Sequence, residues 1–276
     1  MKIALAPILV SVLALGACSS EQAAGVRGEG ERPTIVSLNP CTDAIAAELA
    51  EPSQLLALSH YSHDPSASSI DPQLARQFAI TGGTVEEVLA FDPDIVIADT
   101  FLQPSTKRAL EALGIRVEVF DITSDIEASR DQVRRMADLL GVPDKGGELI
   151  SRIDNALYDL RENASAGQPT AILWQPGGLV GGEDALVSQL LRDAGFAIHP
   201  AVRDLGQGGY LPLEMVLTDP PDILILAGAT RGQRHKALEE IEGMELAHFD
   251  SSLLYCGGPS IIRAAERLAE IRGRET

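Results

Sequence analysis

The stretch TVEEVLAFDPDIVIA at residues 84–98 returns in outline as LPLEMVLTDPPDILILA at residues 211–227. Each copy contains a glutamate, Glu86 or Glu214, followed by a Val-Leu pair and a Pro-Asp-Ile tripeptide. Roughly half the chain separates the copies, as expected if two similar lobes contain one copy each. Two lobes commonly hold a ligand in the cleft between them, so the repeat predicts a two-lobed binding protein.

Length and composition fit this prediction. The chain has 276 residues, enough for one large domain or two small ones. A hydrophobic fraction of 45% is typical of a globular protein. The formal net charge of −18 argues against nucleic-acid binding, which requires a basic surface, and favours docking onto a basic partner.

Residues 1–18 have the pattern of a targeting segment. Lys2 precedes the short apolar run Ile3–Leu15, which predicts a secretory signal peptide because the run is too short for a transmembrane helix. Leu15-Gly-Ala-Cys18 resembles a bacterial lipobox, which implies that Cys18 is lipidated and anchors an exported protein to a membrane. The alternative is a plain signal peptide with an incidental cysteine. Residues 19–32 are small and polar, and predict a flexible tether.

The other two cysteines, Cys41 and Cys256, leave two alternatives open. An exported compartment permits a disulfide, and this one would join distant parts of the chain. Two buried free thiols are the other interpretation.

Strand and helix patterns alternate across residues 33–125, which predicts a parallel, doubly wound sheet. The unbroken apolar run within Asp94–Ala98 suits a strand buried on both faces. The predicted strands are Thr34–Leu38, Leu55–Leu58, Asp94–Ala98 and Arg116–Phe120, and the predicted helices are Thr42–Leu49, Glu86–Ala90 and Ser105–Leu113.

Residues 126–166 show helical spacing and no strand pattern, with a break at Gly141-Val142-Pro143. They predict a long helical connector, which resists bending because bending breaks backbone hydrogen bonds. Residues 167–276 return to an α/β pattern. The predicted fold class is therefore α/β, with two Rossmann-like lobes of parallel sheet, a helical connector and a ligand cleft between the lobes. The elements expected in the second lobe are the strands Thr170–Trp174 and Asp222–Leu226 and the helices Ala185–Ala194, Leu213–Leu217 and Pro259–Arg272.

Several motifs in this order resemble the periplasmic substrate-binding proteins of iron–siderophore and cobalamin ABC importers, the class with a rigid helical backbone. The resemblance covers residues 32 to about 272, and implies a non-enzymatic protein that delivers a cobalt or iron complex to a permease dimer in the inner membrane. The motifs are Arg32-Pro-Thr-Ile-Val-Ser-Leu38, Leu58-Ser-His-Tyr-Ser-His-Asp-Pro65, Val85–Ile97, Leu113-Gly-Ile-Arg-Val117 and Gly258-Pro-Ser260.

The resemblance implies a docking role for the repeated glutamates. The family has one glutamate on each lobe that pairs with arginines of a permease subunit, and Glu86 and Glu214 match those positions. Each lies off the apolar face of its short helix, and carboxylate–arginine pairs give an interface its register. Glu87 is the competing candidate in the first lobe, and the alternative is that both glutamates are merely solvated near a helix N-terminus.

Ligands of doubly wound sheets lie beyond the carboxyl ends of the strands. This rule selects the loops after the predicted strands, and the resemblance favours Tyr61, which matches an aromatic position of the cobalamin site. Aromatic rings and glycines suit a large flat ligand, because rings stack and glycines permit close approach. The candidate loops are Asn39–Thr42, Ser59–Asp64, Asp99–Phe101, Gln175–Gly178, Gly206–Tyr210, Gly228–Arg231 and Leu254–Gly258. The candidate ligand-binding residues are Tyr61, His60, His63, Phe101, Gly178, Tyr210 and Tyr255.

Charged residues near these loops add further alternatives. His60 or His63 is a candidate ligand of the metal in a bound haem or corrinoid, although a surface histidine is the plainer interpretation. Arg203, Arg231 and Arg234 are candidates for contacts with anionic ligand groups, although loop arginines are usually solvated.

Two other functions remain as alternatives. A free zinc or manganese carrier shares the helical backbone, but a closed zinc site needs about four ligands and the histidines are sparse. A chelatase-like enzyme would need an acid–base pair in the cleft. The sequence shows no nucleophile elbow, phosphate-binding loop or catalytic triad, so we predict no catalytic residue, no cofactor and no protein-bound metal.

Overall fold

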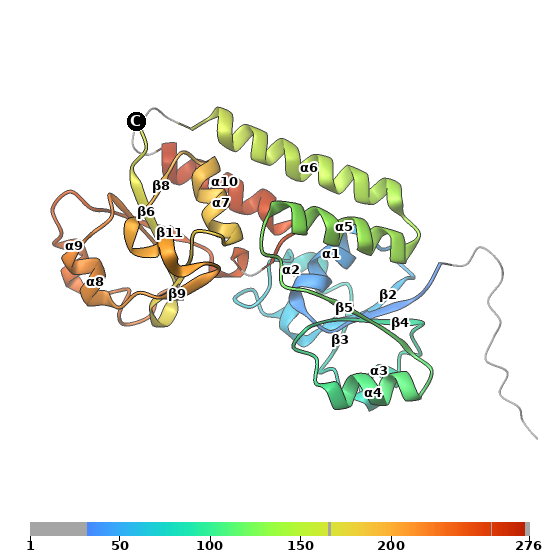
Figure 1. The fold of residues 1–276 in the computed structure, drawn as a ribbon. Coiled ribbons are helices and arrows are strands. Elements are labelled where there is room, and N and C mark those ends of the chain that lie inside the picture. The colour runs from blue at the N-terminus through green and yellow to red at the C-terminus, as the bar shows by residue number, and fades with distance from the viewer. Residues whose placement is uncertain (1–31, 165–166, 255, 274–276) are drawn as a thin grey trace, which may run out of the picture. The chain divides into compact units, whose positions relative to one another are not determined.

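Two β-sheets flanked by helices make up the fold (Figure 1). The computed structural model describes residues 32–164, 167–254 and 256–273, and the chain from Arg32 onward forms one compact unit. Residues 1–31, including Cys18, lie outside the described part, so the predicted signal peptide, tether and lipidation site have no structural counterpart here. Within the described residues, no helix is both long and apolar enough to cross a membrane.

The first sheet is entirely parallel, with the strand order β3-β2-β1-β4-β5. This confirms the predicted doubly wound lobe, whose central strands are buried. The short strand β3 was not predicted, because two of its three residues are exposed and it has no apolar run. The strands are β1 (Ile35–Ser37), β2 (Leu55–Ser59), β3 (Ala79–Thr81), β4 (Ile95–Asp99) and β5 (Arg116–Phe120), and the helices are α1 (Pro40–Leu49), α2 (Pro72–Ala75), α3 (Val85–Leu89) and α4 (Pro104–Ala112).

The second sheet is mixed, with the order β11-β10-β6-β7-β9 and with β8 also beside β6. The predicted parallel pairing is confirmed for β11, β10, β6 and β8, and the sheet also has an antiparallel edge that was not predicted, where β7 pairs with β6 and with β9. Gly177 and Gly178 have positive φ angles of 76° and 84°, which let the chain turn back directly after β6. The strands are β6 (Thr170–Trp174), β7 (Leu179–Gly181), β8 (Ala197–Ile198), β9 (Gly208–Tyr210), β10 (Ile223–Ala227) and β11 (Glu245–Phe249), and the helices are α7 (Leu186–Asp193), α8 (Leu213–Thr218), α9 (Lys236–Glu239) and α10 (Ser260–Arg272).

The connector consists of two helices, α5 (Ile126–Leu140) and α6 (Pro143–Glu162). Helix α6 contacts α5 and α1 on the side of the first sheet, and α7 and α10 on the side of the second (Figure 1). One continuous buried apolar cluster includes residues of both sheets and of α5, α6 and α10. Because this core is shared, moving the lobes apart would expose apolar surface to water, which opposes such a motion.

The sequence repeat forms the same unit in both lobes: α3 followed by β4, and α8 followed by β10. Its aspartates also play the same part. Oδ2 of Asp94 accepts hydrogen bonds from the amide and hydroxyl of Thr34 at 2.7 and 2.8 Å. Oδ2 of Asp222 accepts the same pair from Thr170, both at 2.7 Å. Each aspartate therefore ties its strand to the start of the neighbouring parallel strand.

Candidate functional site

Two pockets lie at the carboxyl ends of the first sheet. The crossover connections diverge between β1 and β4, because β2 and β3 lie on one side and β5 on the other. Such a switch point leaves a crevice above the strand ends, where doubly wound proteins bind ligands. We call the two cavities the inner pocket and the outer pocket.

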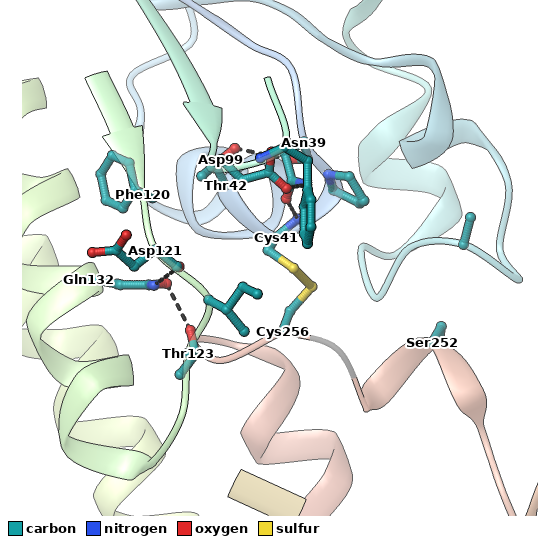
Figure 2. Close-up of a pocket in the computed structure, with 14 residues that line it drawn as sticks. Asn39, Cys41, Thr42, Asp99, Phe120, Asp121, Thr123, Gln132, Ser252 and Cys256 are labelled. Atoms are coloured by element: carbon teal, nitrogen blue, oxygen red, sulfur yellow. Dashed lines mark hydrogen bonds between the residues drawn. A yellow bond between two sulfur atoms is a disulfide. The ribbon is translucent and has the colours of Figure 1, made fainter. Parts of the chain in front are cut away.

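The inner pocket has a volume of about 370 Å³. It lies between the first lobe and the segment that precedes α10, and Figure 2 shows residues from both sides around it. Its first-lobe walls come from the start of α1, the ends of β4 and β5, and Gln132 of α5. Its lining residues are Asn39, Pro40, Cys41, Thr42, Ala67, Asp99, Phe101, Phe120, Asp121, Ile122, Thr123, Gln132, Ser252 and Cys256.

The outer pocket has a volume of about 530 Å³ and shares Asn39, Pro40, Asp99 and Phe101 with the inner pocket. These shared residues make the two pockets adjoining parts of one site. The remaining lining residues of the outer pocket are Leu38, Tyr61, Gly82, Gly83, Ala98, Leu102, Gln103 and Thr106.

Asn39 organises the boundary between the pockets. Its Oδ1 caps α1 by accepting a hydrogen bond from the amide of Cys41 at 2.8 Å, and its Nδ2 donates to Oδ2 of Asp99 at 2.5 Å. The other oxygen of Asp99 accepts from the amide of Phe101 at 2.9 Å. The ends of β1 and β4 are therefore held together by polar side chains at the pocket rim.

Cys41 and Cys256 form a disulfide, which settles the alternative left open by the sequence in favour of the bridge (Figure 2). It connects the first turn of α1 to the segment before α10, 215 residues later. Both cysteines line the inner pocket. The bond therefore joins the lobes at the candidate ligand site.

The segment after Cys256 also packs tightly onto the first lobe. A Cβ atom at Gly258 would lie 2.7 Å from Cγ1 of Ile45, and the backbone there has a φ of 69°, so glycine is required on both counts. The amide of Gly258 donates to Oγ of Ser129 at 2.7 Å. Nearby, Arg263 of α10 donates to the carbonyl oxygen of Ser69 at 2.9 Å. The lobes are thus joined by noncovalent contacts as well as by the disulfide.

The structure brings two of the predicted ligand-binding residues together. Tyr61 and Phe101 both line the outer pocket, with half of the Tyr61 side chain and 71% of Phe101 exposed. The ring of His60 stacks on Tyr61 with centroids 4.0 Å apart. His63 instead bonds through Nε2 to the carbonyl oxygen of Ala75 at 3.0 Å, which gives it a structural contact.

The predicted residues of the second lobe lie elsewhere. Gly178 and Tyr210 line neither pocket. Gly178 is buried beneath Tyr210, where a Cβ atom would lie 2.7 Å from the tyrosine ring. The segment predicted as a loop contains β9, so Tyr210 projects from a strand with 64% of its side chain exposed. Tyr255 lies outside the described residues.

Asp43 supports the turn that carries Tyr61. This carboxyl is fully buried, and its Oδ2 accepts hydrogen bonds from the amide and hydroxyl of Ser59 and from the hydroxyl of Ser62, at 2.9, 2.5 and 2.7 Å. Its Oδ1 has no hydrogen-bond partner among the described residues. Burial raises the pKa of Asp43 to about 7, although the serine hydroxyls oppose the shift. No sequence signal marks Asp43, because an acidic residue in the first turn of a helix is ordinary.

No group of three histidine, cysteine, aspartate or glutamate side chains with the geometry of a metal site occurs among the described residues. The same rule that selected the other loops would also have found Asp121, Ile122 and Thr123, which directly follow β5. Gln132 was not identifiable, because it reaches the pocket from a helix distant from any strand end.

The repeated glutamates are both exposed on their short helices, and no side-chain hydrogen bond or ion pair of either appears among the described contacts. Glu87, the competing candidate, forms hydrogen bonds within the protein. Its Oε2 accepts from the amide of Gly82 at 2.7 Å, and with Thr84 it forms a capping box at the start of α3. Glu86 and Glu214 are therefore the equivalent carboxylates that remain accessible to a partner.

Comparisons with known proteins agree on one fold. The family model described as periplasmic binding protein matches residues 35–247. The periplasmic haem-binding protein HutB of Vibrio cholerae has a TM-score of 0.72 at 15% identity, over 87% of this chain and 99% of that one. The periplasmic haem-binding protein RhuT from Roseiflexus sp. RS-1 in apo form has a TM-score of 0.69 at 19% identity, over 88% of this chain and 97% of that one. The periplasmic vitamin B12 binding protein BtuF of Vibrio cholerae has a TM-score of 0.67 at 19% identity, over 88% of this chain and 97% of that one. A comparison with curated proteins finds no match.

Proposed function

We propose that this chain, which belongs to the periplasmic binding protein family, is the substrate-binding protein of an ABC importer for a cobalt or iron chelate. The observation that carries the proposal is the pair of adjoining pockets at the switch point of the first sheet, where Tyr61 and Phe101 are exposed. Exposed rings beside a roomy crevice suit a large ligand with flat faces. The proteins of similar fold named above for haem and vitamin B12 support this ligand class.

Delivery requires a surface that a membrane permease recognises. Glu86 and Glu214 occupy equivalent positions in the repeated units, one in each lobe. A permease dimer offers two equivalent subunits, so one carboxylate for each would fix the orientation of the complex. We assign these two residues to docking, with arginines as the expected partners.

Cys18 is the proposed lipidation site, and residues 19–32 the tether that leads from the lipid to the folded part. An anchored carrier in the periplasm remains close to the inner-membrane permease that it supplies. Metabolic labelling with palmitate tests this assignment: wild type should be labelled and Cys18→Ala should not. Equal labelling of both proteins would refute the lipid anchor.

Ligand titration tests the central proposal. Isothermal titration of the full folded part with cyanocobalamin, haemin and ferrioxamine B should show saturable binding of at least one chelate. Tyr61→Ala should weaken that binding by roughly tenfold, the size of one lost ring stack. Tyr158→Ala is the matched control, since Tyr158 is similarly exposed but lies on α6 away from both pockets. Failure of all three chelates to bind would refute the proposal.

A further inference from the structure

The inner pocket has walls that are mostly apolar. Its apolar surface comes from Pro40, Ala67, Phe101, Phe120, Ile122 and the Cys41–Cys256 disulfide. Phe120 is almost completely buried, so its ring packs mostly against the protein interior. An uncharged, apolar part of a ligand would gain free energy by leaving water for this pocket.

The charged groups in the walls are all negative. Asp99 and Asp121 line the inner pocket, and Asp99 also lines the outer one. Among the described residues, no lysine, arginine or histidine lines either pocket. A carboxylate placed there would lose hydration without gaining a cationic partner, and would also be repelled by the two aspartates.

One cation lies close to a ring of the inner pocket but does not change this balance. The guanidinium of Arg135 lies 4.4 Å from the centroid of the Phe120 ring but does not line the pocket. Its charge is paired with Glu118, at 2.5 Å between Nη2 and Oε2. The loop arginines considered from the sequence, Arg203, Arg231 and Arg234, line neither pocket.

We infer that this site selects chelates that are neutral or cationic, and that the inner pocket takes an uncharged apolar part of the ligand. This inference rests on the proposed function, because it concerns the ligand of the same two pockets. The fold alone does not identify the charge of the ligand, since the similar proteins named above bind haem or vitamin B12. The charges of the pocket walls in this chain do distinguish ligands in this way. A ligand whose carboxylates must enter the crevice is excluded by the same argument.

Matched pairs of chelates test the inference, each pair differing only in a carboxylate. The pairs are cyanocobalamin and its monocarboxylic acid, ferrioxamine B and its N-succinyl derivative, and haemin dimethyl ester and haemin. In any pair that binds, the chelate without the extra carboxylate should bind at least about tenfold more tightly than its carboxylated partner. The ratio should shrink at high salt, because added ions screen the repulsion.

Asp121→Asn supplies a direct variant, since Asp121 is exposed and only its backbone oxygen appears among the described hydrogen bonds, so we expect the substitution to leave the fold intact. It should reduce the preference within the binding pair, whereas Asp144→Asn, an exposed carboxylate on α6 away from both pockets, should not. Equal or tighter binding of the carboxylated form would overturn the inference and leave the proposed function standing. The absence of binding by any scaffold in either form would instead overturn the proposed function.

Discussion

Cys41, in the first turn of α1, is covalently joined to Cys256, which precedes α10, and both line the inner pocket. The bond lies at the inner pocket, whereas α6 connects the lobes through a separate set of helix contacts. Two connections at different places restrict relative motion of the lobes more than either would alone. We expect a ligand site that is largely formed before the ligand arrives.

Removal of the disulfide should destabilise the protein. A bridge across 215 residues closes a very long loop in the unfolded chain, and the chain-entropy model assigns such a bridge about 5 kcal/mol. Urea unfolding of the Cys41→Ser/Cys256→Ser variant should show a loss of this order. The reductant dithiothreitol should lower the stability of wild type but not of the variant. Unchanged stability after confirmed reduction would contradict the prediction.

Charge reversal at the two docking glutamates should separate delivery from binding. The Glu86→Lys/Glu214→Lys variant should lose at least about tenfold in ligand uptake by vesicles that contain the permease, because like charges would then face the permease arginines. Ligand affinity should stay unchanged, since neither residue lines a pocket. Glu148→Lys on α6 is the control for added charge. Normal uptake by the double variant would disprove the docking assignment.

Asp43 should make stability depend on pH in an unusual direction. Its pKa in the folded state, about 7, lies above its ordinary value. A raised pKa gives stability that is complete below the unfolded-state pKa and is lost as the pH rises through the folded-state pKa. Between about pH 4 and pH 7, wild type should therefore lose stability relative to Asp43→Asn, by an amount on the order of 4 kcal/mol. Urea unfolding across this range measures the difference. Parallel pH profiles for the two proteins would rule out the predicted titration of Asp43.

Asp222 should show the opposite dependence. Hydrogen bonds from the amide and hydroxyl of Thr170 lower the pKa of Asp222. Its contribution is therefore present above its unfolded-state pKa and is lost as the pH falls through the folded-state value. At neutral pH, Asp222→Ala should lower the free energy of unfolding by about 1 kcal/mol, a modest effect because the group is exposed. Thr170→Val should be destabilising and Thr170→Ser nearly neutral, since only serine keeps the hydroxyl. Equal effects of the valine and serine variants would argue against the hydroxyl contact.

Much of the fold was predictable because the determining interactions are local. The apolar runs gave β1, β2, β4, β5, β6 and β10, and α5 was predicted with the bounds that the structure shows. The strands that were missed are short or lie at sheet edges, where the hydrogen bonds of a neighbouring strand, rather than an apolar run, decide the conformation. A Pro-Thr pair occurs at the start of one strand in each lobe: Pro33-Thr34 directly precedes β1, and Pro169-Thr170 ends on the first residue of β6, so the sequence similarity of the lobes includes these strands.

Some residues of the candidate site were also predictable from the sequence, and others were not. The rule for carboxyl strand ends selected Tyr61 and Phe101, which the structure places in one pocket. It also selected the segments of Gly178 and Tyr210, but the glycine turn and the antiparallel hairpin place those residues outside both pockets. Gln132 and the role of Asp43 depended on contacts between elements far apart in the chain.

The sequence by itself determined the α/β class, the helical connector and the repeated unit with its glutamates, because periodicity and local hydrogen bonding encode these features. Only the tertiary structure decided that Cys41 and Cys256 meet and that the charged groups in the described pocket walls are carboxylates. The physical reason is the same in both cases: a disulfide and the charge of a cavity are properties of atoms brought together by packing, and sequence order does not specify those distances.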